Sequence, residues 1–193
     1  HPWLFRQEVT SLIGESEVIH PRLVSIPLSE NTFSRISRAA LIDDALQYSE
    51  SYVIGEGTNS SQIARAISEW STKFLMPGTF AVRSRSIGIP IDGISTKEIE
   101  MAVGDSISSE INNVDLDDPQ IEISVVIAGQ TEGDPHPDPL EDTPPIAVWG
   151  IRNPEWGREK YSGRSPTERP FFKPVSLEPR QARLMISLGH RPG

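Results

Sequence analysis

The stretch TFAVRSRSIG (79–88) lies at the centre of the predicted fold. Phe80 and Val82 point to one side of an extended strand, whereas Arg83 and Arg85 point to the other. This alternation predicts a strand that buries one face and presents two arginines on the opposite face. The two arginines have two interpretations. Either these side chains, two residues apart on one face of the strand, each pair with a phosphate, or they form surface salt bridges on an exposed sheet face.

One helix is predicted on each side of this strand. Four apolar residues recur at helical intervals before it, and Pro77-Gly78 ends that helix. Ser95 and Glu98 form a capping box, which begins a second helix that is expected to reach about Asn112. The apolar residues of the first helix are Ile63, Ile67, Trp70 and Phe74, and those of the second are Ile99, Val103, Ile107 and Ile111.

Two more strands are predicted after the second helix. A turn over 114–120 leads into an apolar strand over 120–129, and residues 145–151 form the next strand. Between these strands, residues 129–145 carry five acidic residues, five prolines and no lysine or arginine. This composition indicates an exposed loop.

The N-terminal region predicts a smaller unit of mixed structure. Helices are expected over 3–13 and 31–48, and strands over 17–21, 22–28 and 51–57. One additional strand in front would complete the β-α-β-β-α-β order of a ferredoxin-like arrangement. We therefore expect that a short strand has been lost before the first residue.

The C-terminal residues predict a helix that ends in a turn. The helix would begin after the candidate N-cap Ser176 and end at Gly189. Because no strand follows the turn, we expect this chain to be a piece of a larger enzyme. Pro179 lies in the first turn of this helix, and its apolar residues at helical spacing are Ala182, Met185 and Leu188.

Charge is distributed unevenly along the chain, whose formal net charge is −9. Residues 1–145 carry 9 lysines and arginines against 23 acidic residues, whereas residues 146–193 carry 9 against 4. Such a basic tail either follows an RNA backbone or is a solvated linker whose aromatic residues pack on a neighbouring domain. The basic residues of the tail are Arg152, Arg158, Lys160, Arg164, Arg169, Lys173, Arg180, Arg183 and Arg191.

The sequence predicts no catalytic, cofactor-binding or metal-binding residue. The absence of cysteine excludes disulfides, cysteine-ligated zinc and thiol nucleophiles, and it fits a reducing cytoplasm. His136 is the only histidine among carboxylates, and it lies in the proline-rich loop, a poor metal cage. NPEW (153–156) is similar to the Asn/Asp-Pro-Pro-aromatic loop of amino-group methyltransferases, but Glu155 replaces the second proline. No aliphatic run is long enough to span a membrane.

Two motifs in this chain resemble those of a known family. The first is F-x-V-R-x-R at 80–85, and the second is R-P-F-F-x-P-x-S-L-x-P-x-x-A-R at 169–183. Together with the helix that begins after Ser95 and the strand over 120–129, these two motifs resemble a THUMP domain and the segment that connects it to the next domain, here called the exit segment. The order of the parts resembles the N-terminal half of the archaeal tRNA guanine-N2 methyltransferases over nearly the whole chain.

This resemblance implies an α+β chain in three parts. An incomplete ferredoxin-like domain at 1–57 precedes a THUMP domain at 58–152, into which the acidic loop 129–145 is inserted. A basic linker and helix at 153–193 would lead to a Rossmann-like methyltransferase domain that this chain lacks.

The resemblance also implies a cytoplasmic protein that binds tRNA. In its full-length form it would use S-adenosylmethionine to methylate a guanine amino group, whereas this chain alone would hold no cofactor. The residues expected to bind RNA are Arg83, Arg85, Arg152, Arg158, Lys160, Arg164, Arg169, Lys173, Arg180 and Arg183. For Arg180 and Arg183, pairing with the missing methyltransferase domain is an equal alternative.

Three other functions fit the sequence. One is a stand-alone THUMP adaptor that binds RNA without a catalytic domain. Another is the THUMP part of a thiouridine or pseudouridine synthase. The third is a protein-interaction module whose basic tail docks an acidic partner. The resemblance of the exit segment favours the methyltransferase.

Overall fold

The computed structural model describes residues 2–131, 140, 142–153 and 178–189. The chain forms two compact units: unit 1 comprises residues 1–45 and 153–193, and unit 2 comprises residues 46–152. Each unit combines helices and strands, so the chain is an α+β protein. Most of the predicted acidic loop lies outside the described residues.

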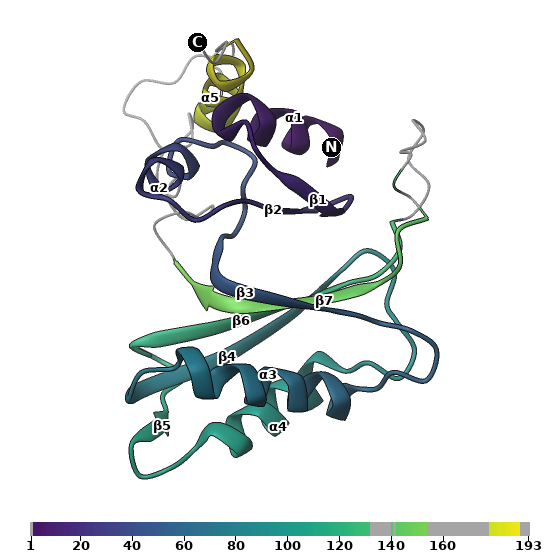
Figure 1. Ribbon diagram of the computed structural model, residues 1–193, viewed down its shortest axis with the longest axis vertical. Coiled ribbons are helices and arrows are strands. Elements are labelled where there is room, and N and C mark those ends of the chain that lie inside the picture. Colours follow the sequence, from purple (N-terminus) through teal and green to yellow (C-terminus); the bar gives the residue numbers. More distant parts are fainter. Residues whose placement is uncertain (1, 132–139, 141, 154–177, 190–193) are drawn as a thin grey trace. The chain divides into compact units, whose positions relative to one another are not determined.

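Unit 2 is a five-stranded mixed sheet with two helices across one face (Figure 1). The strands lie in the order β3-β7-β6-β4-β5. Strand β4 runs parallel to both of its neighbours, and the other pairs are antiparallel. The helices are α3 (Ser60–Phe74) and α4 (Thr96–Ile107), and the strands are β3 (Leu46–Val53), β4 (Gly78–Ile87), β5 (Asn112–Val114), β6 (Ile121–Ala128) and β7 (Ile146–Arg152).

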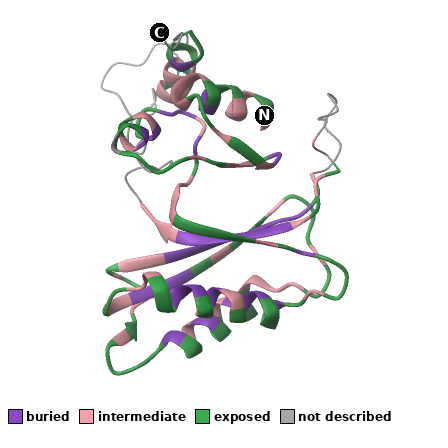
Figure 2. Cartoon of the chain, in the orientation of Figure 1, coloured by how far each residue is buried: buried purple, intermediate pink, exposed green. Residues whose placement is uncertain are grey.

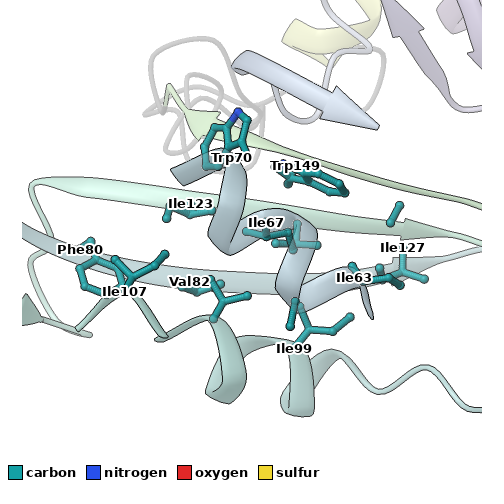
Figure 3. Close-up of a cluster of buried hydrophobic side chains, with 14 of the residues drawn as sticks. Ile63, Ile67, Trp70, Phe80, Val82, Ile99, Ile107, Ile123, Ile127 and Trp149 are labelled. Carbon is teal, nitrogen blue, oxygen red and sulfur yellow. The ribbon is translucent and has the colours of Figure 1, made fainter. Parts of the chain in front are cut away.

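The core of unit 2 lies between this sheet and its helices (Figure 3). Helix α3 begins at a capping box in which Asn59 and Gln62 each accept a hydrogen bond from the backbone N–H of the other. Its predicted apolar face is confirmed, because Ile63, Ile67 and Trp70 are at most 1% exposed. Strand β7 is buried as well, except for its last two residues (Figure 2). Each fully buried aliphatic side chain stabilises the fold by about 1.5–3 kcal/mol relative to an exposed one.

The edge of β4 that faces β5 is only partly paired in the described residues. Strand β5 pairs with β4 along Gly78–Phe80, whereas β6 pairs with it as far as Ile87. Beyond β5, the carboxylate of Glu100 on α4 accepts a hydrogen bond from the backbone N–H of Ser84 at 2.5 Å. Because an open strand edge invites pairing with another chain, this contact protects the strand that carries the two predicted arginines.

Unit 1 packs helices and a strand pair around a small apolar cluster. Its elements are α1 (Pro2–Ile13), the antiparallel strands β1 (Glu17–His20) and β2 (Leu23–Ser25), α2 (Glu30–Ile36) and α5 (Pro179–Gly189). The predicted apolar side of the first helix is confirmed, since Val9 is buried and Phe5 and Leu12 pack against the same cluster. Helix α5 packs on α1, where the Ser11 hydroxyl donates to the carbonyl of Ser187 at 2.9 Å.

The strand predicted at 51–57 is found at Leu46–Val53, and it belongs to unit 2 rather than to the N-terminal unit. It pairs with β7 as the edge strand of the large sheet, so unit 2 begins at Leu46. The described part of unit 1 therefore has a two-stranded sheet, and this strand does not close a ferredoxin-like one. Local alternation predicts that a strand forms, but its pairing partner is decided by packing between distant segments.

The helix predicted over 31–48 ends at Ile36. Downstream of it, the two oxygens of the fully buried Glu8 carboxylate accept hydrogen bonds from the backbone N–H groups of Ala40 and Leu41, each at 2.7 Å. In a helix that continued past Ile36, these two N–H groups would instead donate to backbone carbonyls of the preceding turn. A distant side chain thus overrides the helix propensity of Ala39 and Ala40.

Helix α4 also ends earlier than predicted. It stops at Ile107 instead of Asn112, and Ile111 is 64% exposed rather than part of an apolar helix face. The reason is that residues 112–114 pair with β4 as the short strand β5. Such a short strand carries too little alternation to be recognised in the sequence.

The predicted apolar face of the C-terminal helix differs from the observed one. Helix α5 begins at Pro179, and the candidate N-cap Ser176 lies outside the described residues. Met185 and Leu188 are exposed, whereas Ser187 is the buried residue of this helix.

Candidate functional site

Two of the predicted arginines lie on the face of the unit 2 sheet that is opposite α3 and α4. Along β4, Phe80 and Val82 belong to the core beneath the helices, so the alternate residues Arg83 and Arg85 point away from it. Both arginines are exposed. Arg152 on β7 shares this side of the sheet, and we call the three residues the arginine face.

Arg152 is largely neutralised within the arginine face. Its guanidinium lies 3.2 Å from the carboxylate of Glu122, and the two side chains are only 19% and 26% exposed. Glu122 precedes the core residue Ile123 on β6, which places this ion pair on the side away from the helices. The two exposed arginines of the face are therefore Arg83 and Arg85.

Arg83 is tied to the loop between β5 and β6. Its guanidinium donates a hydrogen bond to the carbonyl of Leu116 at 2.5 Å. In the same loop, the N–H groups of Asp118 and Asp117 donate to the Asp115 carboxylate at 3.0 Å each, and they lower the pKa of that carboxyl below its ordinary value. Arg83 thus orders an acidic loop, a role that the alternation in the sequence did not predict.

Arg180 and Arg183 bind the segment 38–43 within unit 1. Arg180 donates to the carbonyl of Ala40 at 2.5 Å and to the carboxylate of Asp43 at 2.6 Å. Arg183 donates to the carbonyl of Arg38 at 2.8 Å. These contacts brace α5 against the segment that Glu8 also holds, and a role of either arginine in RNA binding stays a prediction.

We expect Arg180→Ala to lower the free energy of unfolding of unit 1 by about 1 kcal/mol, because it removes two hydrogen bonds from a charged donor that is partly screened by solvent. Urea unfolding followed by circular dichroism measures the change. Arg22→Ala is the matched control, since Arg22 is exposed and lies between β1 and β2. Equal stabilities of the two variants would contradict the bracing role.

The other predicted RNA-binding residues lie outside the described residues: Arg158, Lys160, Arg164, Arg169 and Lys173. Within the described ranges, histidine and acidic side chains form no group of three or more that could hold a metal ion. Nor does this part of the chain contain a helix with the length and hydropathy required to cross a membrane.

The turn from β4 to α4 does not fit S-adenosylmethionine. A nucleotide-like cofactor needs a glycine-containing turn between strand and helix that leaves space for a close backbone approach. Here the chain itself fills that space: the N–H of Ile89 donates to the carbonyl of Gln130 at 2.8 Å. A Cβ on Gly88, whose φ is +76°, would lie 2.5 Å from the same oxygen. Gly88 therefore allows its loop to pack closely against the loop at Gln130. The turn from β4 to α4 has no assigned role in methyl transfer.

Residues 58–131 match the family model of the THUMP domain. The matched range contains α3, β4, α4, β5 and β6, and with them Arg83 and Arg85 of the arginine face. The chain therefore contains a THUMP domain, which lies within unit 2.

Two known proteins are similar to most of the chain. A tRNA (guanine(10)-N2)-dimethyltransferase of Pyrococcus abyssi is 27% identical over 137 residues, which cover 70% of this chain and 36% of that protein, in its N-terminal part. The crystal structure of TrmN from Thermus thermophilus has a TM-score of 0.56 at 18% identity, and the match covers 97% of this chain and 51% of that one. The chain thus spans about a third to a half of these proteins.

A further solved structure is more distant. The complex of a 4-thiouridine synthetase with RNA and bound ATP has a TM-score of 0.43 at 14% identity, and the match covers 78% of this chain and 35% of that one. No functional assignment is based on this likeness.

Proposed function

We propose that this chain is the tRNA-binding region of an S-adenosylmethionine-dependent tRNA (guanine(10)-N2)-methyltransferase or dimethyltransferase. The observation that carries the proposal is a THUMP domain whose strand β4 carries two exposed arginines, Arg83 and Arg85. The similarity to the Pyrococcus abyssi dimethyltransferase supports the choice of enzyme. In this function the chain holds tRNA so that a guanine amino group reaches the methyl donor, in the cytoplasm.

The arginine face is suited to a folded RNA because recognition of structured RNA depends mainly on shape and on phosphates. Arg83 and Arg85 are the phosphate contacts in this proposal. The guanidinium of Arg83 also donates to the carbonyl of Leu116, beside three aspartates. The net charge of −9 opposes long-range attraction, so the basic groups must act at short range.

Methyl transfer itself belongs to the whole protein. S-adenosylmethionine supplies the methyl group when it is bound, and the turn from β4 to α4 does not fit it. We expect the 193-residue chain to bind tRNA without methylating it.

A salt titration of tRNA binding tests the proposal. In filter binding, the affinity of the chain for unmodified tRNA is expected to fall linearly on a log–log plot as salt rises, by a slope of about 0.7–0.9 per phosphate contact. An affinity that does not depend on salt, or no binding in dilute buffer, would contradict the proposed function.

Neutralising the acidic loop beside Arg83 is expected to strengthen tRNA binding. Asp117→Asn combined with Asp118→Asn removes two negative charges near the proposed phosphate path, and we expect an increase in affinity of about threefold at low salt that disappears at high salt. The control combines Asp105→Asn with Glu69→Gln, which removes two exposed charges from α4 and α3 on the other side of the sheet. An equal gain in both variants would attribute the effect to net charge and not to the loop.

A further inference from the structure

Strand β3 carries a bulge opposite Gly150. Gln47 pairs with Ile151 and Glu50 with Trp149, so the two residues between them on β3 face one residue on β7. The first of these is Tyr48, whose φ of +53° lies in the left-handed region. Glycine normally occupies such a bulge position, and a tyrosine there is a strained exception.

The surrounding structure holds Tyr48 in this conformation. The indole N–H of the fully buried Trp70 donates to the Tyr48 carbonyl at 2.8 Å. Across the bulge, a Cβ on Gly150 would lie 2.7 Å from the carbonyl oxygen of Gln47, so only glycine permits this approach of the two backbones. Three elements, β3, β7 and α3, therefore act together to place one side chain.

That side chain is an aromatic ring that remains accessible. The Tyr48 ring stacks on Phe74 with centroids 5.3 Å apart and an interplanar angle of 17°, yet the residue is 51% exposed. Phe74 in turn packs against Trp70 at 5.7 Å. The ring is thus supported from the core on one side and is available on the other.

We propose that Tyr48 is a stacking platform for an unpaired nucleobase of the bound RNA. This inference rests on the proposed function and adds a contact that is distinct from the arginine face. Aromatic side chains bind splayed bases without strong sequence preference, because every base has a π-face. A bulge at a sheet edge commonly re-aims a side chain toward a ligand, and the retained strain at Tyr48 fits that use.

Charge around the platform favours a nucleotide over an apolar side chain of a protein. Lys73 precedes Phe74 on α3, and its side chain is 64% exposed, with the carboxylate of Glu50 as a distant partner at 3.9 Å. A phosphate next to a stacked base would therefore meet the positive charge of Lys73 beside the ring.

The test uses a six-nucleotide cytidine oligoribonucleotide that contains one 2-aminopurine, whose fluorescence is quenched when the base stacks. We expect the intact chain and Tyr48→Phe to quench it, and Tyr48→Leu to lose the quenching and about tenfold in affinity. If Tyr48→Leu does not fold, Tyr48→Gly replaces it, because glycine adopts the left-handed conformation without strain. Circular dichroism of each variant verifies the fold.

Filter binding of tRNA separates this proposal from the function on which it rests. Salt-dependent tRNA binding together with unquenched 2-aminopurine, or with quenching that Tyr48→Leu leaves unchanged, overturns the platform and retains the proposed function. Absence of tRNA binding in dilute buffer removes both.

Discussion

Trp70→Ala is expected to lower the free energy of unfolding of unit 2 by about 4 kcal/mol. Trp70 is 1% exposed and lies in the core between α3 and the sheet (Figure 3), so its removal leaves a large cavity. The substitution also removes the indole donor from the Tyr48 carbonyl, which then lacks this partner at a strained bulge. Urea unfolding followed by circular dichroism measures the loss.

Two further variants separate the contributions of Trp70. Trp70→Phe keeps most of the apolar volume but lacks the N–H, and we expect a loss of about 1–2 kcal/mol. Trp3→Ala is the control for removal of an exposed indole, since Trp3 is 53% exposed, and it should change stability by no more than about 0.5 kcal/mol. A cost of Trp70→Ala as small as that of Trp3→Ala would contradict the observed core.

Glu8→Ala is expected to lower the free energy of unfolding of unit 1 by about 3 kcal/mol. The Glu8 side chain is fully buried, and its carboxylate accepts two hydrogen bonds of 2.7 Å from the backbone of Ala40 and Leu41. Removing it leaves the Ala40 N–H buried without this acceptor and releases the segment that continues from α2. The measurement is again urea unfolding, read from the transition of unit 1.

Glu8→Gln and Glu15→Ala complete this experiment. The amide keeps one acceptor oxygen and replaces the other with a donor, so we expect an intermediate loss of about 2 kcal/mol. Glu15 is an exposed carboxylate just after α1, and its replacement should be nearly neutral. If Glu8→Ala were as mild as Glu15→Ala, the carboxylate would not be what holds residues 40 and 41.

Local patterns in the sequence predicted the elements with strong periodicity. Helix α3 was predictable because Ile63, Ile67 and Trp70 repeat at helical spacing, and all three are buried. The alternation of Phe80 and Val82 with Arg83 and Arg85 likewise predicted both faces of β4. These features depend on neighbours in the sequence, and they need no knowledge of distant contacts.

The wrong predictions share a physical cause, which is long-range contact. Helix α2 stops at Ile36 because Glu8 and Arg180 bind the backbone that follows it, and neither residue is near in sequence. Strand β3 joins the sheet of unit 2 through its pairing with β7, which an alternating pattern alone cannot specify.

The candidate site was only partly predictable for the same reason. The sequence placed Arg83 and Arg85 on one face, but it could not show that Arg83 binds the loop carbonyl of Leu116. Tyr48 gave no signal at all, since its importance comes from a backbone conformation and not from a motif. The ion pair of Arg152 with Glu122 also depends on register between strands.

The salt dependence of tRNA binding by Arg85→Ala, compared with Arg65→Ala, tests the central claim most directly. Arg65 is an exposed arginine of α3, on the other side of the sheet, and its side chain is 82% exposed. We expect Arg85→Ala to reduce the slope of log affinity against log salt by about 1 and Arg65→Ala to leave it unchanged. Equal slopes for both variants and the unaltered chain would show that the arginine face does not contact the phosphates of tRNA.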